Sequence, residues 1–314
     1  MRSARRPGCA SPAPPEGFGP HRLPVSLLAA VLLGLIQAAT EFLPVSSTAH
    51  LLVFGELLGQ GLDDARFRAF VTIIQSGTTL AVVAYFREEL WRLAAAGLSS
   101  LRRRRPLETP ESRLFWYIAL GTLPAAVAGK LLERRIEALG NWVMAGSLVA
   151  WAVLLLAAER LARHERTVAE VGPRDALLVG VGQALALVPG TSRSGATLAA
   201  GMLLGLRRED AARFSFLLSV PIILGAGAYK LWKALPALRG EPAWRDATLA
   251  ATLVSLAAGY LVIGWLLRWL RTRTTYLFVA WRLVAAAAVA LLIWQGVLPA
   301  GVAAPPRPSV LRAP

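Results

Sequence analysis

The chain has 314 residues, of which 55% are hydrophobic, and its mean hydropathy is +0.52. This composition is too apolar for a soluble globular protein of that length and indicates a protein that resides in lipid. The formal net charge of +15 comes mostly from arginine. In a membrane protein such an excess is typical of cytoplasmic loops that follow the positive-inside rule.

Two classes of partner or chemistry are excluded at this level. The basic residues form no stripe interleaved with aromatic residues, so no nucleic-acid partner is expected. The one dense run, at 102–105, lies between apolar segments and is interpreted as a topology signal. Cys9 is the single cysteine, so the sequence predicts neither an intrachain disulfide nor a multi-cysteine metal site.

In chain order, residues 1–24 form a basic, Pro-rich leader that is predicted to be disordered. Residues 25–58 are apolar but broken at Pro44-Val45-Ser46-Ser47, and residues 175–206 are broken in the same way at Pro189-Gly190-Thr191-Ser192. Residues 298–314 are predicted to be a disordered tail. Six unbroken apolar segments, each near the roughly 20 residues that a bilayer requires, are predicted to span the membrane: 67–86, 114–133, 141–159, 211–233, 246–267 and 276–297.

The arginines predict how the broken segments run. They are concentrated in three stretches that should face the cytoplasm, at 87–113, 160–174 and 207–213. The last two flank the segment 175–206, so the chain is expected to enter and leave there on one side, as a re-entrant helix-turn-helix. If 25–58 is re-entrant as well, the N-terminus lies outside, although the basic residues of the leader oppose this placement.

The two broken segments resemble each other in sequence. Both contain Gly-x-x-Gln-Ala followed by a proline and hydroxyl residues, beginning at Gly34 and at Gly180. The alternative is a chance similarity between two Pro-broken apolar helices. An inverted repeat, about 25–133 and 175–267, would place a site near the bilayer midplane. The predicted fold is therefore an all-α polytopic membrane protein, with one catalytic domain at 25–297 that contains about six transmembrane helices and two re-entrant segments.

The first break has one acidic residue. Glu41 is the only acid between residues 17 and 55, and an ionisable group within an apolar helix costs roughly 2.5–3.5 kcal/mol on insertion scales. Gln37 lies one turn earlier on the same face. These side chains are candidates for a site that the break encloses. The alternative is that Glu41 only pairs with an arginine to fasten two helices.

Three hydroxyl residues open the half-helix that follows Pro44: Ser46, Ser47 and Thr48. Free backbone N–H groups and the positive end of the helix dipole gather at such a start, which makes it a candidate anion site. Serine and threonine are also simply favoured N-caps, but a single cap needs a single hydroxyl. His50 follows Ser47 by three residues and is a candidate base for nucleophilic catalysis; the alternative is a structural histidine.

The second break contains Arg193 between two serines, Ser192 and Ser194, and after Thr191. A guanidinium group is suited to phosphate oxygens, although an ion pair with Glu41 alone would be structural. Hydroxyls, a base, an acid, an arginine and helix N-termini are together what phosphoryl transfer requires, because positioning and charge neutralisation supply most of that catalysis.

Both breaks closely resemble the two signature motifs of the undecaprenyl-diphosphatase family, of the bacitracin-resistance type. The matching stretches are Gln37-Ala38-Ala39-Thr40-Glu41-Phe42-Leu43-Pro44-Val45-Ser46-Ser47-Thr48-Ala49-His50 and Pro189-Gly190-Thr191-Ser192-Arg193-Ser194-Gly195-Ala196-Thr197. Both motifs are long and specific, and the resemblance extends over residues 25–297.

The resemblance implies an inner-membrane enzyme, surrounded by membrane lipids, that releases phosphate from undecaprenyl diphosphate at a site facing the periplasm. It thereby recycles the carrier lipid for peptidoglycan synthesis and confers bacitracin resistance. It implies catalytic roles for the matching residues Glu41, Ser47, His50 and Arg193. Substrate contacts are expected for the neighbouring residues, namely Gln37, Ser46, Thr48, Thr191, Ser192 and Ser194.

The sequence departs from the family at two positions. Many members have Glu where this chain has Gln37, and Gly where it has Ala49. A glutamine does not bind a divalent ion as a carboxylate does, so a metal role built on two glutamates is in doubt here. The sequence leaves open whether Mg²⁺ or Ca²⁺ is needed and whether the chain forms a homodimer.

The mechanism suggested by the motifs has Arg193 hold the diphosphate while Ser47, deprotonated by His50 with the help of Glu41, attacks the terminal phosphorus. Direct attack by a water that His50 activates is the alternative. A transporter or flippase of an anionic prenyl lipid is the main rival, because inverted repeats with broken helices are also a transporter architecture. The membrane lipid phosphatases with a histidine nucleophile fit less well, because no His-x-x-x-Asp follows Arg193.

Overall fold

The computed structural model describes residues 26–60, 65–238 and 242–301. Within these ranges the structure has α-helices, two short 3₁₀ turns (Val168–Glu170 and Leu235–Leu238) and no strands. The helices are α1 (Leu27–Phe42), α2 (Ser47–Leu57), α3 (Ala65–Tyr85), α4 (Arg87–Arg102), α5 (Pro110–Glu137), α6 (Asn141–Leu161), α7 (Pro173–Leu185), α8 (Arg193–Leu203), α9 (Arg208–Ala234), α10 (Pro242–Thr272) and α11 (Tyr276–Trp294).

Five of these helices are long and apolar enough to cross a membrane: α3, α5, α6, α10 and α11. Helix α9 is a sixth if its two parts, which are bent by 41°, are taken as one span. All six coincide with the predicted spans. The pairs α1–α2 and α7–α8 correspond to the two broken segments. The predicted fold class, an all-α polytopic membrane protein, is confirmed.

The chain doubles back between α7 and α8. The backbone N–H of Arg166, before α7, donates to the carbonyl of Gly205 after α8 at 2.9 Å, and the N–H of Arg207 donates to the carbonyl of Arg166 at 2.8 Å. The side chain of Arg166 also binds the Leu204 carbonyl at 2.7 Å. Since the start and the end of this segment are hydrogen-bonded to each other, it enters and leaves on one side, as the arginine pattern predicts.

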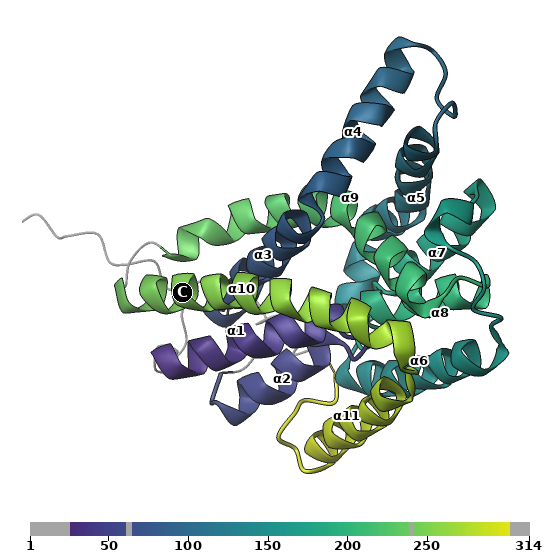
Figure 1. The fold of residues 1–314 in the computed structure, drawn as a ribbon. Coiled ribbons are helices and arrows are strands. Elements are labelled where there is room, and N and C mark those ends of the chain that lie inside the picture. The colour runs from purple at the N-terminus through teal and green to yellow at the C-terminus, as the bar shows by residue number, and fades with distance from the viewer. Residues whose placement is uncertain (1–25, 61–64, 239–241, 302–314) are drawn as a thin grey trace, which may run out of the picture.

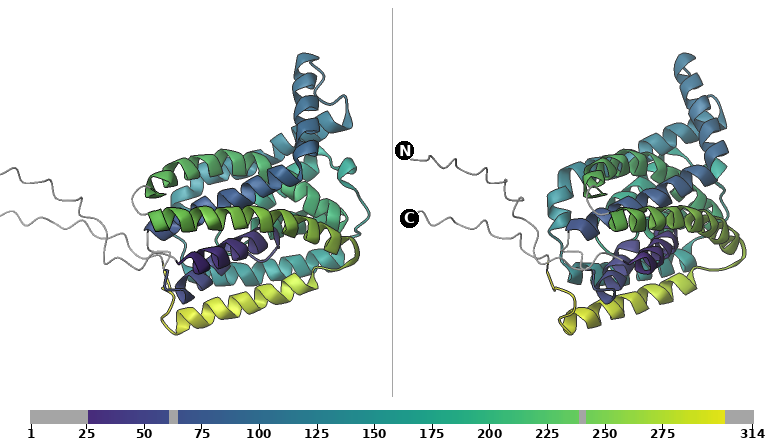
Figure 2. Two further views of the ribbon diagram at one scale, coloured as in Figure 1. Left: turned by 60° about the vertical axis from the view of Figure 1, so that its left-hand side comes forward. Right: turned by 90° about the vertical axis from the view of Figure 1, so that its left-hand side faces the viewer.

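Two glycines at corresponding positions of the sequence repeat make corresponding contacts. Gly34 of α1 packs against α10, where an added Cβ would lie 2.6 Å from the Ala251 carbonyl oxygen. Gly180 of α7 packs against α5, where an added Cβ would meet the Gly121 carbonyl. Figures 1 and 2 show α1 lying beside α10. Each re-entrant half-helix therefore rests on the last long helix of the other repeat, and this crossed packing brings the two breaks together.

Helix α4 lies in a stretch for which the arginines predict a cytoplasmic loop. Its first turn contains Glu88 and Glu89 and its last turn Arg102, charges that favour a helix through its dipole. Together with the start of α5 it projects from the helix bundle (Figure 1). Its base is attached to α9 by an ion pair between Glu89 and Arg213, at 2.8 Å.

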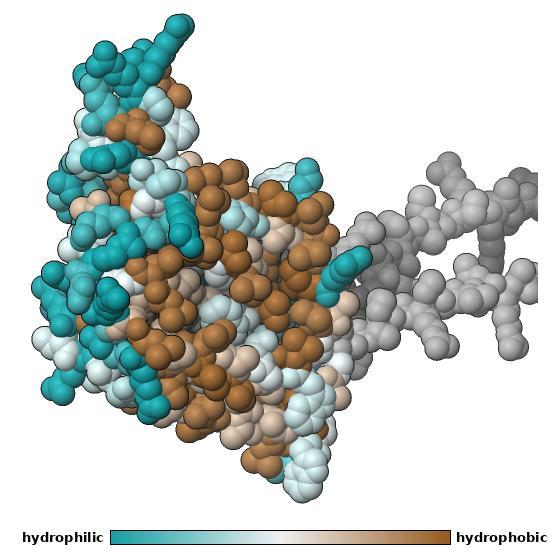
Figure 3. Space-filling model, turned by 90° about the vertical axis from the view of Figure 1, so that its right-hand side faces the viewer, coloured by the Kyte–Doolittle hydropathy of each residue, from teal (hydrophilic) through white to brown (hydrophobic). Residues whose placement is uncertain are grey.

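The surface of the bundle is apolar. In Figure 3 hydrophobic residues cover a broad zone, and hydrophilic residues gather at one side of it and on the projection. After α11, Leu298 is buried beside α6, and Asn141 donates to the Pro299 carbonyl at 2.8 Å. The remainder of the predicted tail and the predicted leader lie outside the described residues.

Candidate active site

The two breaks have the same unusual backbone. Ser46, which precedes α2, has φ 76° and ψ 99°, and Ser192, which precedes α8, has φ 69° and ψ 113°. A positive φ is uncommon for a residue other than glycine, and such strain concentrates at functional sites. The hydroxyl of Ser194 donates to the Leu43 carbonyl at 3.0 Å and joins the two breaks directly. The N-termini of α2 and α8 therefore meet inside the bundle.

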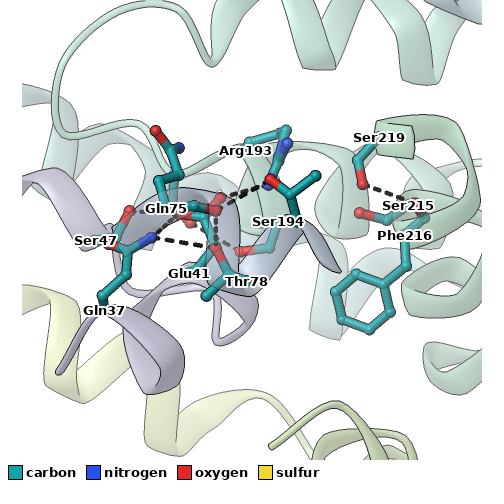
Figure 4. Close-up of polar contacts among 12 residues, drawn as sticks. Gln37, Glu41, Ser47, Gln75, Thr78, Arg193, Ser194, Ser215, Phe216 and Ser219 are labelled. Carbon is teal, nitrogen blue, oxygen red and sulfur yellow. Dashed lines mark hydrogen bonds and ion pairs between the residues drawn. The ribbon is translucent and has the colours of Figure 1, made fainter. Parts of the chain in front are cut away.

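Glu41 lies at the centre of the polar contacts (Figure 4). Its Oε1 accepts a hydrogen bond from the guanidinium of Arg193. Its Oε2 accepts from Ser47 Oγ at 2.8 Å and from Gln37 Nε2 at 3.2 Å. The carboxylate side chain is 8% exposed and the guanidinium side chain 22%. An acid, a hydroxyl and a cation are thus brought together by Glu41 within the helix bundle.

The other predicted residues surround this cluster in different environments. Ser192 Oγ accepts from the Gly195 N–H at 3.2 Å as a helix cap and lies 3.1 Å from Ser194 Oγ. Thr191 is buried, and its hydroxyl has no hydrogen-bond partner in the described structure. Ser46 is buried without a side-chain cap hydrogen bond, whereas Thr48 is exposed.

His50 is turned away from Ser47. Its Nδ1–H donates to the Ser46 carbonyl at 2.7 Å, and its Nε2 accepts from Trp281 Nε1 at 2.7 Å. No hydrogen bond joins it to Ser47 in the described structure, so the expected pair of serine and histidine is not present here. Both ring nitrogens of a neutral imidazole are already used, which holds the start of α2 against α11.

The donor set does not fit a divalent cation. Glu41 supplies one carboxylate, and both of its oxygens already accept hydrogen bonds. Gln37 directs its N–H₂ group, not its oxygen, toward Glu41 and toward Thr78 Oγ1 at 3.4 Å. Within the described residues no group of three or more His, Cys, Asp or Glu side chains is placed to hold a metal ion.

A cavity of about 370 Å³ opens from Arg193. It lies between α3, α7 and α9, and its walls are mostly apolar; the C-terminal half of α9, residues 222–231, contributes the largest share of them. The polar or charged residues of its lining are Thr72, Gln75, Ser76, Thr79, Gln183, Arg193 and Lys230. A cationic group beside an apolar cavity suits a ligand with an anionic head and a hydrocarbon chain.

Residues 30–288 match the family described as "Bacitracin resistance protein BacA". The chain belongs to the BacA family. A relative from Anaeromyxobacter sp. (strain Fw109-5) is 73% identical over 286 residues, covering 91% of this chain and 94% of the relative. A more distant relative from Myxococcus xanthus (strain DK1622) is 46% identical over 276 residues, covering 87% and 91%. Both relatives are named undecaprenyl-diphosphatase.

Sequence reasoning missed one residue of this BacA site. Arg282 of α11 is fully buried, and its guanidinium donates to carbonyls of both breaks: Pro44 at 3.1 Å, Gly190 at 3.0 Å and Thr191 at 3.0 Å. It also donates to the Leu148 carbonyl at 3.2 Å. A signal was available, because Arg282 is the only charged residue in the apolar span 276–297, and such a residue suggests a functional role.

Proposed function

We propose that this BacA-family protein hydrolyses undecaprenyl diphosphate to undecaprenyl phosphate and inorganic phosphate, which recycles the carrier lipid for peptidoglycan synthesis and confers bacitracin resistance. One observation carries the proposal: within an apolar bundle, Glu41 binds both the Ser47 hydroxyl and the Arg193 guanidinium where two helix N-termini meet. A hydroxyl, an acceptor for its proton and a cation for the phosphate are thereby in contact.

In the first step Arg193 and the backbone N–H groups that open α2 and α8 hold the diphosphate. Ser47 Oγ attacks the terminal phosphorus, and its proton passes to Glu41 Oε2, to which it is already hydrogen-bonded at 2.8 Å. The bond from this phosphorus to the bridging oxygen breaks, and undecaprenyl phosphate leaves. Glu41 takes the place first assigned to His50 as the base, because the imidazole nitrogens bind Ser46 and Trp281.

In the second step water attacks the phosphoserine. Its phosphorus–Oγ bond breaks, Ser47 regains a proton and inorganic phosphate is released. Glu41, protonated in the first step, is placed to return that proton to Ser47 Oγ. Arg193 stabilises the charge on the transferred phosphoryl group in both steps.

The site opens to the periplasmic side in this proposal. Helix α9 begins among the arginines that the positive-inside rule assigns to the cytoplasm, and the cavity follows its opposite, C-terminal half. The diphosphate head would enter from that end of the bundle, and the prenyl chain would lie against the apolar wall that α9 supplies.

The test is phosphate release from undecaprenyl diphosphate by the detergent-purified protein. Wild type is expected to release phosphate, and Arg193→Ala and Ser47→Ala to lose that activity. A transporter or flippase of the same lipid releases none, so an inactive but correctly folded wild type would contradict the proposal. The control is Ser255→Ala, which changes a buried hydroxyl of α10 outside the site.

The base can be tested separately. Glu41→Gln keeps the size of the side chain but removes the proton acceptor, and we expect the rate to fall by about 10²–10⁴-fold. His50→Gln retains an amide for Trp281 and is expected to retain most of the rate. Rapid quenching with substrate labelled in its terminal phosphate should trap a phosphoenzyme that Ser47→Ala lacks. A phosphoenzyme that persists in Ser47→Ala, or a larger loss in His50→Gln than in Glu41→Gln, would contradict this assignment.

A further inference from the structure

Gln183 of α7 is buried, with 3% of its surface exposed, and yet its amide has no partner. Neither Nε2 nor Oε1 makes a hydrogen bond in the part of the chain that the structure describes. An amide that is removed from water without a partner destabilises the folded protein, and such groups are rare in native structures. Because the unpaired amide destabilises the folded protein, packing alone does not explain its presence.

The sequence repeat explains why the amide is unpaired. Gln183 corresponds to Gln37, whose amide donates to Glu41 one turn later at 3.2 Å and to Thr78 at 3.4 Å. The residue one turn after Gln183 is Leu187, which offers no acceptor. The amide of Gln37 is therefore hydrogen-bonded within the protein, whereas the amide of Gln183, at the corresponding place beside the second break, has no partner in the described structure.

Gln183 belongs to the wall of the cavity that opens from Arg193, and its amide is buried behind the surface of that wall. Gln183, Leu187 and Arg193 all line this space of about 370 Å³. A ligand whose anionic head is held by Arg193 would bring acceptor oxygens into the same cavity, where the N–H₂ group of Gln183 has two hydrogen atoms to donate. The unpaired amide and the cation beside it would then bind one anionic group together.

We propose that Gln183 is a substrate-binding residue, whose amide donates a hydrogen bond to an oxygen of the diphosphate that Arg193 holds. This inference rests on the proposed function, because it takes a prenyl diphosphate as the ligand of the cavity. It assigns the two related glutamines different tasks: Gln37 orients the carboxylate, and Gln183 binds the substrate.

The test compares Gln183→Leu with wild type and with Ser255→Ala, which also changes a buried polar group without a partner but lies outside the cavity. Each protein is purified in detergent. Its melting temperature is measured alone and with saturating farnesyl diphosphate, and its kcat and KM are measured with undecaprenyl diphosphate.

Gln183→Leu is expected to melt at a higher temperature than wild type when free, because the unpaired amide is gone. Its KM should rise about tenfold, as for loss of a hydrogen bond to a charged group, and farnesyl diphosphate should stabilise it less than it stabilises wild type. Gln183→Glu, which places a negative charge against the diphosphate, should raise KM further. Ser255→Ala should retain the KM and the ligand-induced shift of wild type.

Two results would overturn the proposal: an unchanged KM and ligand-induced shift in Gln183→Leu, or a parallel fall of activity and melting temperature, which would indicate a structural role. Failure of the proposed function is a different result. In that case wild type releases no phosphate, and the stabilisation by farnesyl diphosphate in wild type and in Gln183→Leu still decides whether Gln183 contacts the ligand.

Discussion

Glu41 shows how single residues create this site. A carboxylate in an apolar helix is tolerated only when its charge is compensated, and Arg193 supplies that compensation from 152 positions further along the chain. An incoming diphosphate would meet this guanidinium in contact with Glu41, the same carboxylate that binds the Ser47 hydroxyl.

Gln37→Glu tests, at the scale of a single residue, whether a second carboxylate beside Glu41 would create a site for a divalent cation. The substitution places a second carboxylate where an amide now lies 3.2 Å from Glu41. Two adjacent carboxylates repel each other unless a cation binds between them. We expect phosphate release by the variant to depend on Mg²⁺ or Ca²⁺, so that a chelator lowers its rate more than that of wild type.

Gln37→Leu is the matched control, because it also removes the hydrogen bond to Glu41 but adds no charge. It should show the chelator response of wild type. An identical response of Gln37→Glu and Gln37→Leu would argue against a metal site formed by two carboxylates at this position.

At the scale of elements, the breaks depend on Arg282. Its guanidinium binds carbonyls at the ends of two re-entrant half-helices and one in α6, so a single side chain from α11 fixes the position of both breaks. Guanidinium has five donors in a rigid plane, which an ammonium group does not reproduce. Arg282 thus positions both breaks through their backbone carbonyls.

Arg282→Met is expected to lower the free energy of unfolding by about 2 kcal/mol or more, because it leaves several buried carbonyls unpaired. The free energy of unfolding of Arg282→Lys should lie between that of Arg282→Met and that of wild type. Thermal unfolding in detergent measures both effects, and Arg268→Met, at an exposed position of α10, is the control. Equal melting temperatures for Arg282→Met and wild type would contradict the role assigned to this side chain.

The crossed packing of the two repeats makes a second prediction at this scale. Gly34→Ala and Gly180→Ala each push a methyl group into the backbone of a neighbouring helix, and overpacking of this kind costs roughly 1–3 kcal/mol. Both variants should melt at a lower temperature and lose phosphate release. Gly146→Ala in α6 is the control, because an added Cβ meets nothing within 4 Å there.

The two glycine variants are expected to behave alike if the repeats are structurally equivalent. A large effect at one glycine and none at the other would show that the similarity of sequence does not extend to the packing.

At the scale of the whole molecule, one end of the bundle is held together by ion pairs. Arg208 binds Glu159 through several hydrogen bonds, including one of 2.9 Å from Nε, and Glu159 also accepts from the Thr275 N–H at 3.1 Å, which joins α6, α9 and the start of α11. Arg271 binds Glu209 at 2.7 Å. These contacts gather the arginine-rich segments at a single end, as a protein with a fixed orientation in the membrane requires.

Cysteine labelling tests this orientation. In a Cys9→Ser background, single cysteines are placed at three exposed positions: Leu161 at the end of α6, Leu203 at the end of α8, and Trp232 near the end of α9. We expect a membrane-impermeant maleimide to label the Trp232→Cys protein in intact cells, and the other two only after the membrane is opened. Labelling of the Leu203→Cys protein from outside would contradict the re-entrant path of α7 and α8.

The sequence by itself determined the fold class, the six spans and the two breaks, because apolar length and arginine placement are properties of local segments. It also identified Glu41, Ser47 and Arg193 as candidates, since charged and hydroxyl side chains stand out in an apolar helix. The family motifs added the expected chemistry. The sequence did not predict helix α4, because its charged residues are equally typical of a cytoplasmic loop.

Only the tertiary structure decided which groups touch. Glu41 binds Arg193, His50 turns to Trp281, Arg282 fastens both breaks, and Gln183 remains unpaired beside the cavity. None of these contacts follows from spacing along one helix. The physical reason is that a buried polar group must find its partner wherever packing brings one, and here the partners come from helices that are distant in the sequence.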